Sequence, residues 1–148
     1  MSLKNQLKPK TKLQECYWKF WEGFNHFTKS DKAFCEEFKV HPFPSIRSYQ
    51  DYHIGMPFHI VVGINFKLKE IRIGAYFSNL ENYKTWSEER KECLESYINK
   101  KLVWKQHKTK GSIFTYTTAN FGEKYGWEEA YRAMVNTMIQ FKIIFFKM

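Results

Sequence analysis

The sequence predicts an α+β domain with an antiparallel sheet of about five strands and three helices. The predicted order of the elements is α-βββ-α-ββ-α, and the helices lie mainly on one face of the sheet. Three observations support this prediction. Residues 58–77 alternate between apolar and polar positions, residues 13–27 and 127–148 repeat apolar side chains at helical spacing, and short turns join successive strands. Strands joined by short turns pair antiparallel, and such a sheet needs helices over one face only.

The first helix is predicted over residues 13–27, with Thr11 as its N-cap and its end near Ser30 and Asp31. Trp18 and Trp21 widen its apolar stripe. The stripe consists of Leu13, Tyr17, Phe20, Phe24 and Phe27. Residues 41–44, His-Pro-Phe-Pro, exclude regular helix and predict an extended connector.

Alternation defines the strands. One face of residues 58–66 and 71–77 is apolar, and a turn at residues 67–69 joins the two into a hairpin. We expect a preceding strand at residues 51–54. Strands at 102–104 and 113–118 form a second hairpin around a basic loop at residues 105–111.

Two further helices are predicted. One runs from residue 81 to 100 after a cap at Ser78 or Asn79. We expect its core positions to include Tyr83, Trp86, Leu94, Tyr97 and Ile98. The last helix carries a stripe of Trp127, Tyr131, Met134, Met138, Phe141, Phe145 and Met148. This spacing also fits a coiled coil, but in a chain with strands it favours packing on the sheet.

Length and composition favour a single domain over residues 1–148, with residues 1–10 as a flexible N-terminal tail. Twenty-four basic against fifteen acidic residues give a net charge of +9, which favours a polyanionic partner such as nucleic acid. A lysine-rich surface also serves solubility alone. With no long apolar run, we expect a cytoplasmic protein without a membrane partner. The scattered Cys16, Cys35 and Cys93 predict reduced and mostly buried thiols.

Several segments together resemble a known family. They are residues 14–21, the strands with His59-Ile60 and Ile71-Arg72-Ile73, Leu94-Glu95, residues 102–104, residues 111–113 and residues 127–145. In order and spacing they resemble the prokaryotic domain of unknown function 4268 over nearly the whole chain. That domain often follows a restriction-endonuclease-like module, so the resemblance implies a role linked to nuclease or defence systems. Because we expect no such module in this chain, it leaves open whether a separate nuclease-type protein is the partner.

No catalytic signature stands out. The Glu-x-Lys at residues 37–39 has Asp31 too close upstream for a magnesium-dependent nuclease site, and no phosphate-binding glycine loop occurs. Asp51, His53 and His59 are a possible metal set, but histidines on a sheet more often serve no metal, so we assign none. We therefore expect no catalytic residues and no cofactor, and favour a non-catalytic module over an enzyme.

One constellation points to a ligand. With the apolar positions of the first hairpin in the core, His59, Asn65, Arg72 and Tyr76 share the opposite face, near Tyr49 and the basic loop. The candidate nucleic-acid-binding residues are His59, Arg72, Tyr76, Lys105, His107, Lys108 and Lys110. Cations among aromatic rings can neutralise phosphates and stack on bases. A solvated outer face is the commoner arrangement, and a protein-interaction or homodimerisation surface is the alternative function.

Overall fold

The computed structural model describes residues 7–121 and 124–147. Its helices are α1 (Lys12–Lys29), α2 (Lys32–Glu37), α3 (Leu80–Ile98) and α4 (Lys124–Lys147). Its strands are β1 (Tyr49–His53), β2 (His59–Asn65), β3 (Glu70–Phe77), β4 (Val103–Gln106) and β5 (Gly111–Thr118). The predicted α+β class is confirmed, with four helices in the described residues where three were expected. Of the expected tail, residues 1–6 lie outside the described residues, as does Met148 of the last stripe.

The additional helix, α2, follows α1 directly. Thr11 caps α1 as predicted, since its side chain accepts a hydrogen bond from the Gln14 N–H at 3.1 Å. Ser30 is the C-cap of α1, and the Asp31 carboxylate then caps α2 by accepting from the Phe34 N–H at 2.9 Å. With six residues and one fully buried side chain, α2 is too short to produce a periodic pattern.

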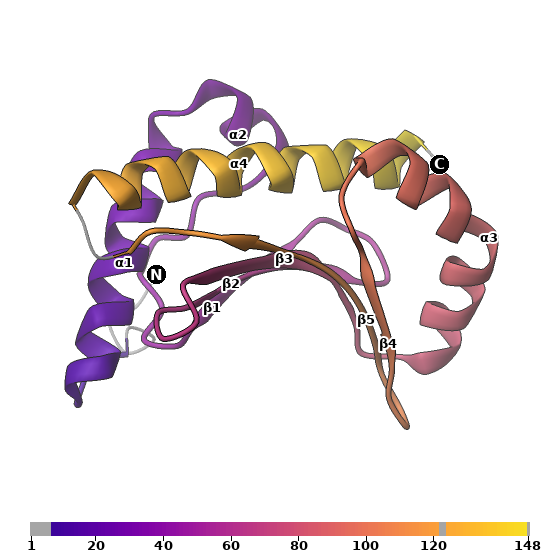
Figure 1. The fold of residues 1–148 in the computed structure, drawn as a ribbon, viewed down its shortest axis with the longest axis horizontal. Coiled ribbons are helices and arrows are strands. Elements are labelled where there is room, and N and C mark those ends of the chain that lie inside the picture. The colour runs from indigo at the N-terminus through magenta and orange to yellow at the C-terminus, as the bar shows by residue number, and fades with distance from the viewer. Residues whose placement is uncertain (1–6, 122–123, 148) are drawn as a thin grey trace.

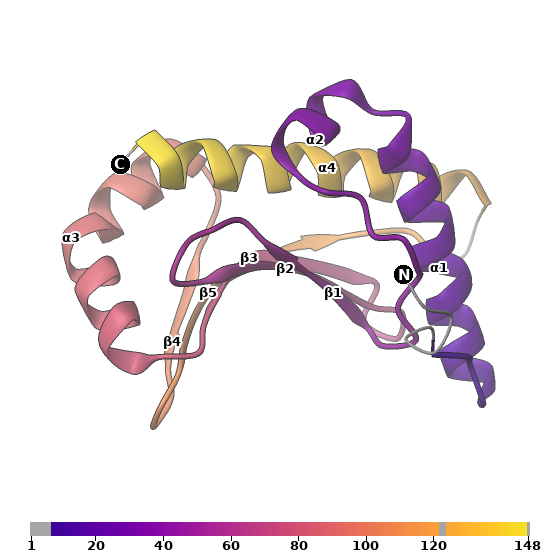
Figure 2. The same cartoon turned by 180° about the vertical axis from the view of Figure 1, so that it is seen from behind.

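The five strands form one antiparallel sheet in the order β1-β2-β3-β5-β4. Pairing of β3 with β5 joins the two predicted hairpins at the centre. Figures 1 and 2 show the sheet as an arch, with α4 crossing its convex side and α1 and α3 at its two ends. None of the described helices covers the concave side.

The core lies between the convex side of the sheet and the helices. The inward side chains of β2 and β3, among them Ile60, Val62, Ile73 and Phe77, are buried as their alternation predicts. The stripe of α4 from Tyr131 to Phe145 is also buried, and α4 contacts β2 and β3. The interpretation of this stripe as core packing is therefore confirmed. Within the described residues, no helix has the length and apolar content needed to cross a membrane.

Some burial predictions were wrong. Tyr97 is 66% exposed, because the packed side of α3 carries Leu94 and Ile98 and leaves the neighbouring position at the surface. Leu13 is 54% exposed in the first turn of α1, which extends beyond the sheet in Figure 1. Helical spacing predicts which face of a helix is apolar. It does not predict how much of that face other helices and strands cover.

The cysteines also differ from the prediction. Cys16, Cys35 and Cys93 are free thiols, and all three are exposed instead of buried. Each lies on a helix whose inward positions are taken by larger apolar side chains, such as Phe20 and Phe24 in α1 and Leu94 in α3. The cysteines therefore occupy outward positions.

Candidate nucleic-acid interface

The side chains of the concave face stand in rows that cross the sheet, and strand register defines each row. The first row comprises His53, His59, Tyr76, Ser112 and Lys105. The second comprises Asp51, Val61, Gly74, Phe114 and Val103, and the third Tyr49, Gly63, Arg72 and Tyr116. All five strands contribute to this face, so one surface collects residues from distant parts of the chain.

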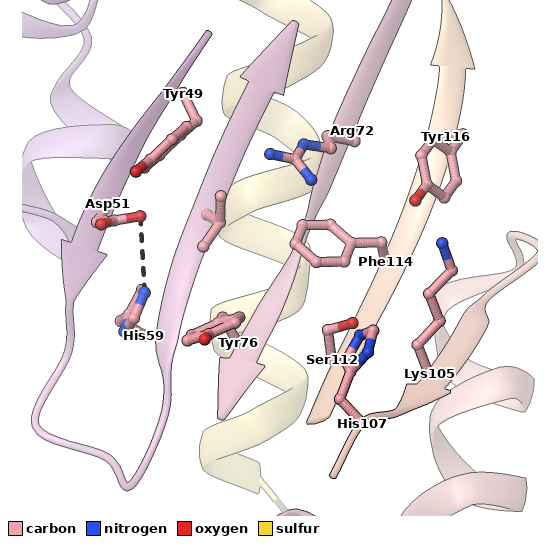
Figure 3. Close-up of a pocket in the computed structure, with 11 residues that line it drawn as sticks. Tyr49, Asp51, His59, Arg72, Tyr76, Lys105, His107, Ser112, Phe114 and Tyr116 are labelled. Carbon is pink, nitrogen blue, oxygen red and sulfur yellow. Dashed lines mark ion pairs between the residues drawn. The ribbon is translucent and has the colours of Figure 1, made fainter. Parts of the chain in front are cut away.

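These rows enclose a hollow of about 450 Å³ (Figure 3). Its lining combines aromatic, cationic and small side chains: Tyr49, Asp51, His59, Val61, Arg72, Tyr76, Lys105, His107, Ser112, Phe114 and Tyr116. Gly74 belongs to the middle row, and a Cβ there would lie 1.9 Å from the Ile113 carbonyl oxygen. Glycine is therefore required where β5 passes this closely.

Arg72 is the central cation of the hollow. Its guanidinium carbon lies 5.2 Å from the centre of the Phe114 ring, and Figure 3 shows the group pointing across β2 toward Tyr49. Phe114 itself is only 6% exposed, so its ring holds the arginine in place instead of offering a free stacking surface. The guanidinium remains half-buried and directed into the hollow, as a phosphate or base contact requires.

Aromatic rings continue along the first row. His53 and His59 have ring centroids 5.2 Å apart, and His59 and Tyr76 are separated by the same distance. The Lys110 ammonium, from the loop between β4 and β5, lies 6.0 Å from the centre of the Tyr76 ring. Tyr76 therefore has imidazoles on one side and a lysine on the other.

Asp51 brings a negative charge to the β1 side of the hollow. Its Oδ1 atom lies 3.6 Å from Nε2 of His59, the contact dashed in Figure 3. Burial lowers the pKa of His59, and repulsion from His53 adds to this, whereas attraction to Asp51 opposes it. Burial likewise lowers the pKa of His41, whose Nε2–H donates to the backbone carbonyl of Asp51 at 2.6 Å. Both imidazoles are therefore held toward their neutral forms near pH 7.

Comparison with known families adds a classification. The family described as Domain of unknown function (DUF4268) matches the chain over residues 16–148. The chain belongs to this family. No curated protein and no solved structure matches it. The geometry of the concave face in this DUF4268 domain is therefore the basis for its proposed role.

The DUF4268 domain brings most of the candidate residues together. His59, Arg72, Tyr76, Lys105 and His107 line the hollow. Lys110 reaches its edge beside Tyr76, whereas Lys108 lies outside the lining, exposed in the same loop. That loop is shorter than expected, because β4 continues through Gln106 and the His107 N–H donates to the Lys110 carbonyl at 2.9 Å.

Several residues that line the hollow were not predicted from the sequence. Ser112, Phe114 and Tyr116 come from β5, and their role follows once Ile113 and Thr115 are recognised as the inward positions of that strand. Asp51 was considered only as a metal ligand. Among the described residues, no group of three or more His, Cys, Asp or Glu side chains is arranged to hold a metal ion.

Proposed function

We propose that this domain is a non-catalytic nucleic-acid-binding module, and that the concave face of its sheet holds a single strand. The observation that carries the proposal is the hollow, where Arg72 and Lys105 lie beside Tyr49, Tyr76 and Tyr116. Binders of single strands combine cations that follow the backbone with rings on which bases stack. The net charge of +9 adds attraction for a polyanion.

An unpaired strand suits this face better than a duplex. Tyr49 and Tyr76 are half-buried, and Tyr116 is 37% exposed, so each ring presents a surface to a ligand in the hollow. Stacking on those rings needs a base whose faces are free, which a single strand supplies and a paired, stacked duplex does not. Lysines at the rim, such as Lys105 and Lys110, would contact phosphates.

Fluorescence anisotropy with labelled single- and double-stranded DNA and RNA, over a series of salt concentrations, tests the proposal. A variant with Lys105, Lys108 and Lys110 all replaced by glutamine should bind single strands more weakly. Its log–log salt slope should be shallower by about 0.7 for each lysine that contacts a phosphate.

A charge-matched control lies on α1. Lys12, Lys19 and Lys29 are exposed on that helix, which Figure 1 places away from the concave face. Replacing these three lysines by glutamine removes the same charge and should leave most of the affinity in place. Equal losses in the two variants would mean that net charge alone attracts the strand, and no binding at low salt would refute the proposal.

A nuclease-type partner, which the family resemblance implies, is compatible with this proposal. A separately encoded nuclease, as the family's association with restriction-endonuclease-like modules implies, would act on a strand that this face holds. Co-purification of the tagged protein with the products of neighbouring genes tests that association, and recovery without any nuclease-type protein would count against it.

Self-association through the same face is the second candidate function. Val61 and Phe114 give the hollow an apolar floor that a second copy could cover. Two copies would, however, bring their Arg72 and Lys105 charges together, and this repulsion ranks the candidate second. Light scattering over a range of concentrations decides it, because a monomer at every concentration excludes a dimer.

A further inference from the structure

The carboxylate of Asp51 is unexpected on a surface proposed to bind phosphates. It is the sole carboxylate among the described residues that line the hollow. A carboxylate repels the phosphate backbone, so Asp51 would weaken backbone binding unless it meets another part of the ligand. A negatively charged acceptor is suited to N–H donors, which the edges of nucleobases carry.

The hydrogen-bonding capacity of Asp51 is not satisfied within the described protein. Its Oδ1 atom is buried and has no hydrogen-bond partner there. His59 Nε2 is 3.6 Å away, which is longer than a hydrogen bond, and the His59 ring is held toward its neutral form. The Asp51 side chain keeps 38% of its surface exposed although Oδ1 is covered, so a ligand can reach the carboxylate at its other oxygen, Oδ2. One carboxylate oxygen can accept two hydrogen bonds, so a ligand with two adjacent N–H donors suits this position.

The position of Asp51 matches one end of a nucleotide. It lies on β1, whereas Lys105 lies on β4, four strand spacings or roughly 19 Å away across the sheet. Tyr76 lies on β3 between them, and the long lysine side chain shortens the gap. A nucleotide with its phosphate near Lys105 and Lys110 would place its base over Tyr76 and His59, with the base edge toward Asp51.

The bases differ in what they offer a carboxylate. Guanine presents N1–H and its 2-amino group side by side, so it can donate to one carboxylate twice. Cytosine and adenine have an amino group beside an acceptor nitrogen. Thymine and uracil have one N–H between two carbonyl oxygens, which repel a carboxylate.

We infer that the hollow is a subsite for one unpaired guanine, whose N1–H and 2-amino group donate to the carboxylate of Asp51. This inference rests on the proposed function and makes it specific. In a duplex both groups pair with cytosine, so the subsite selects a guanine in a single strand. Arg72 and the lysines hold the backbone regardless of sequence, and Asp51 supplies the preference.

A short thymidine oligomer with one central guanine, compared with the all-thymidine strand, tests the inference by anisotropy. Guanine should raise the affinity about ten-fold, within the range of a good two-bond base contact. Hypoxanthine lacks the 2-amino group and should lose most of that gain. The matching ribo-oligomers, with uridine for thymidine, determine whether the preference holds for RNA as well as DNA.

The variant Asp51→Asn completes the test. It has nearly the same shape but one N–H₂ in place of an acceptor, so the guanine preference should disappear while affinity for the all-thymidine strand stays the same or rises. Equal affinity of the unmodified protein for strands with and without guanine overturns the inference and leaves the proposed function standing. Failure to bind either strand at low salt overturns both. The comparison of strands that differ in one base uses the unmodified protein. It therefore remains a valid test even if Asp51→Asn destabilises the fold.

Discussion

The side chain of Arg72 fills the space directly above Gly63. A Cβ at Gly63 would lie 2.5 Å from Nε and 2.9 Å from Cγ of Arg72, closer than side-chain atoms normally approach. Residues 63 and 72 face each other on neighbouring strands. The missing side chain on β2 therefore allows the arginine on β3 to lie low across the sheet and reach the hollow.

Gly63→Ala should weaken binding through Arg72. The added methyl group displaces the middle of a flexible side chain, so the free energy of unfolding should change by no more than about 1 kcal/mol. Affinity for a single strand should fall several-fold, as it should in Arg72→Gln. In the double variant the losses should be less than additive, because both changes remove one contact. Additive losses in anisotropy titrations would mean that Gly63 acts independently of Arg72.

Tyr131 anchors α4 to α1, and its hydroxyl should contribute to stability. The hydroxyl donates to the Phe20 carbonyl at 2.7 Å, and burial raises the pKa of Tyr131. Tyr131→Phe leaves that carbonyl without its donor and should cost about 1–2 kcal/mol in urea unfolding. Tyr97→Phe makes the same chemical change at an exposed site and should stay within about 0.5 kcal/mol of the unmodified protein. Equal effects would exclude a structural role for the hydroxyl group.

Acid should destabilise the fold through His41 and His59. Burial lowers the pKa of both below their ordinary value of about 6.5, so the unfolded chain binds more protons as pH falls. The free energy of unfolding should be highest above pH ~6.5, fall below that value, and stop falling once pH lies below the folded-state pKa values. His41→Gln should flatten this dependence and His26→Gln, a control at an exposed site, should not. Unchanged pH dependence in His41→Gln would contradict the assignment.

The cysteines should react without unfolding. Cys16, Cys35 and Cys93 are all exposed, so a thiol reagent should titrate each of them in the native protein. We expect Cys35 to react last, because its sulfur lies 3.2 Å from the Thr28 carbonyl oxygen. Mass spectrometry of the labelled peptides gives the order. Labelling that requires denaturant would contradict the exposed positions.

The elements were predictable from sequence where a long pattern repeats. The alternation of residues 58–77 and the apolar stripe of the last helix each fit only one orientation of the element. In any other orientation the apolar side chains would lose their burial. The cap at Thr11 was equally local. In contrast, α2 carries one buried aromatic, Phe34, and a single residue defines no period.

The candidate site was predictable only in part. Alternation placed His59, Arg72 and Tyr76 on one face, but it does not say which strands are neighbours across a long connection. Pairing of β3 with β5, separated by α3, is what adds Phe114 and Tyr116 to that face. The Oδ1 atom of Asp51 has no hydrogen-bond partner within the described residues because His59 Nε2 lies 3.6 Å away, and no sequence pattern gives that distance.

Photochemical cross-linking can show whether a bound single strand lies on the concave face. A single strand carrying 5-iodouracil is irradiated with the protein, and the modified peptides are identified by mass spectrometry. We expect cross-links at Tyr49, Tyr76 and Tyr116, and we expect them to disappear when unlabelled strand competes. Cross-links confined to α1 or to Tyr97 of α3, at the two ends of the sheet, would contradict a nucleic-acid interface on the concave face.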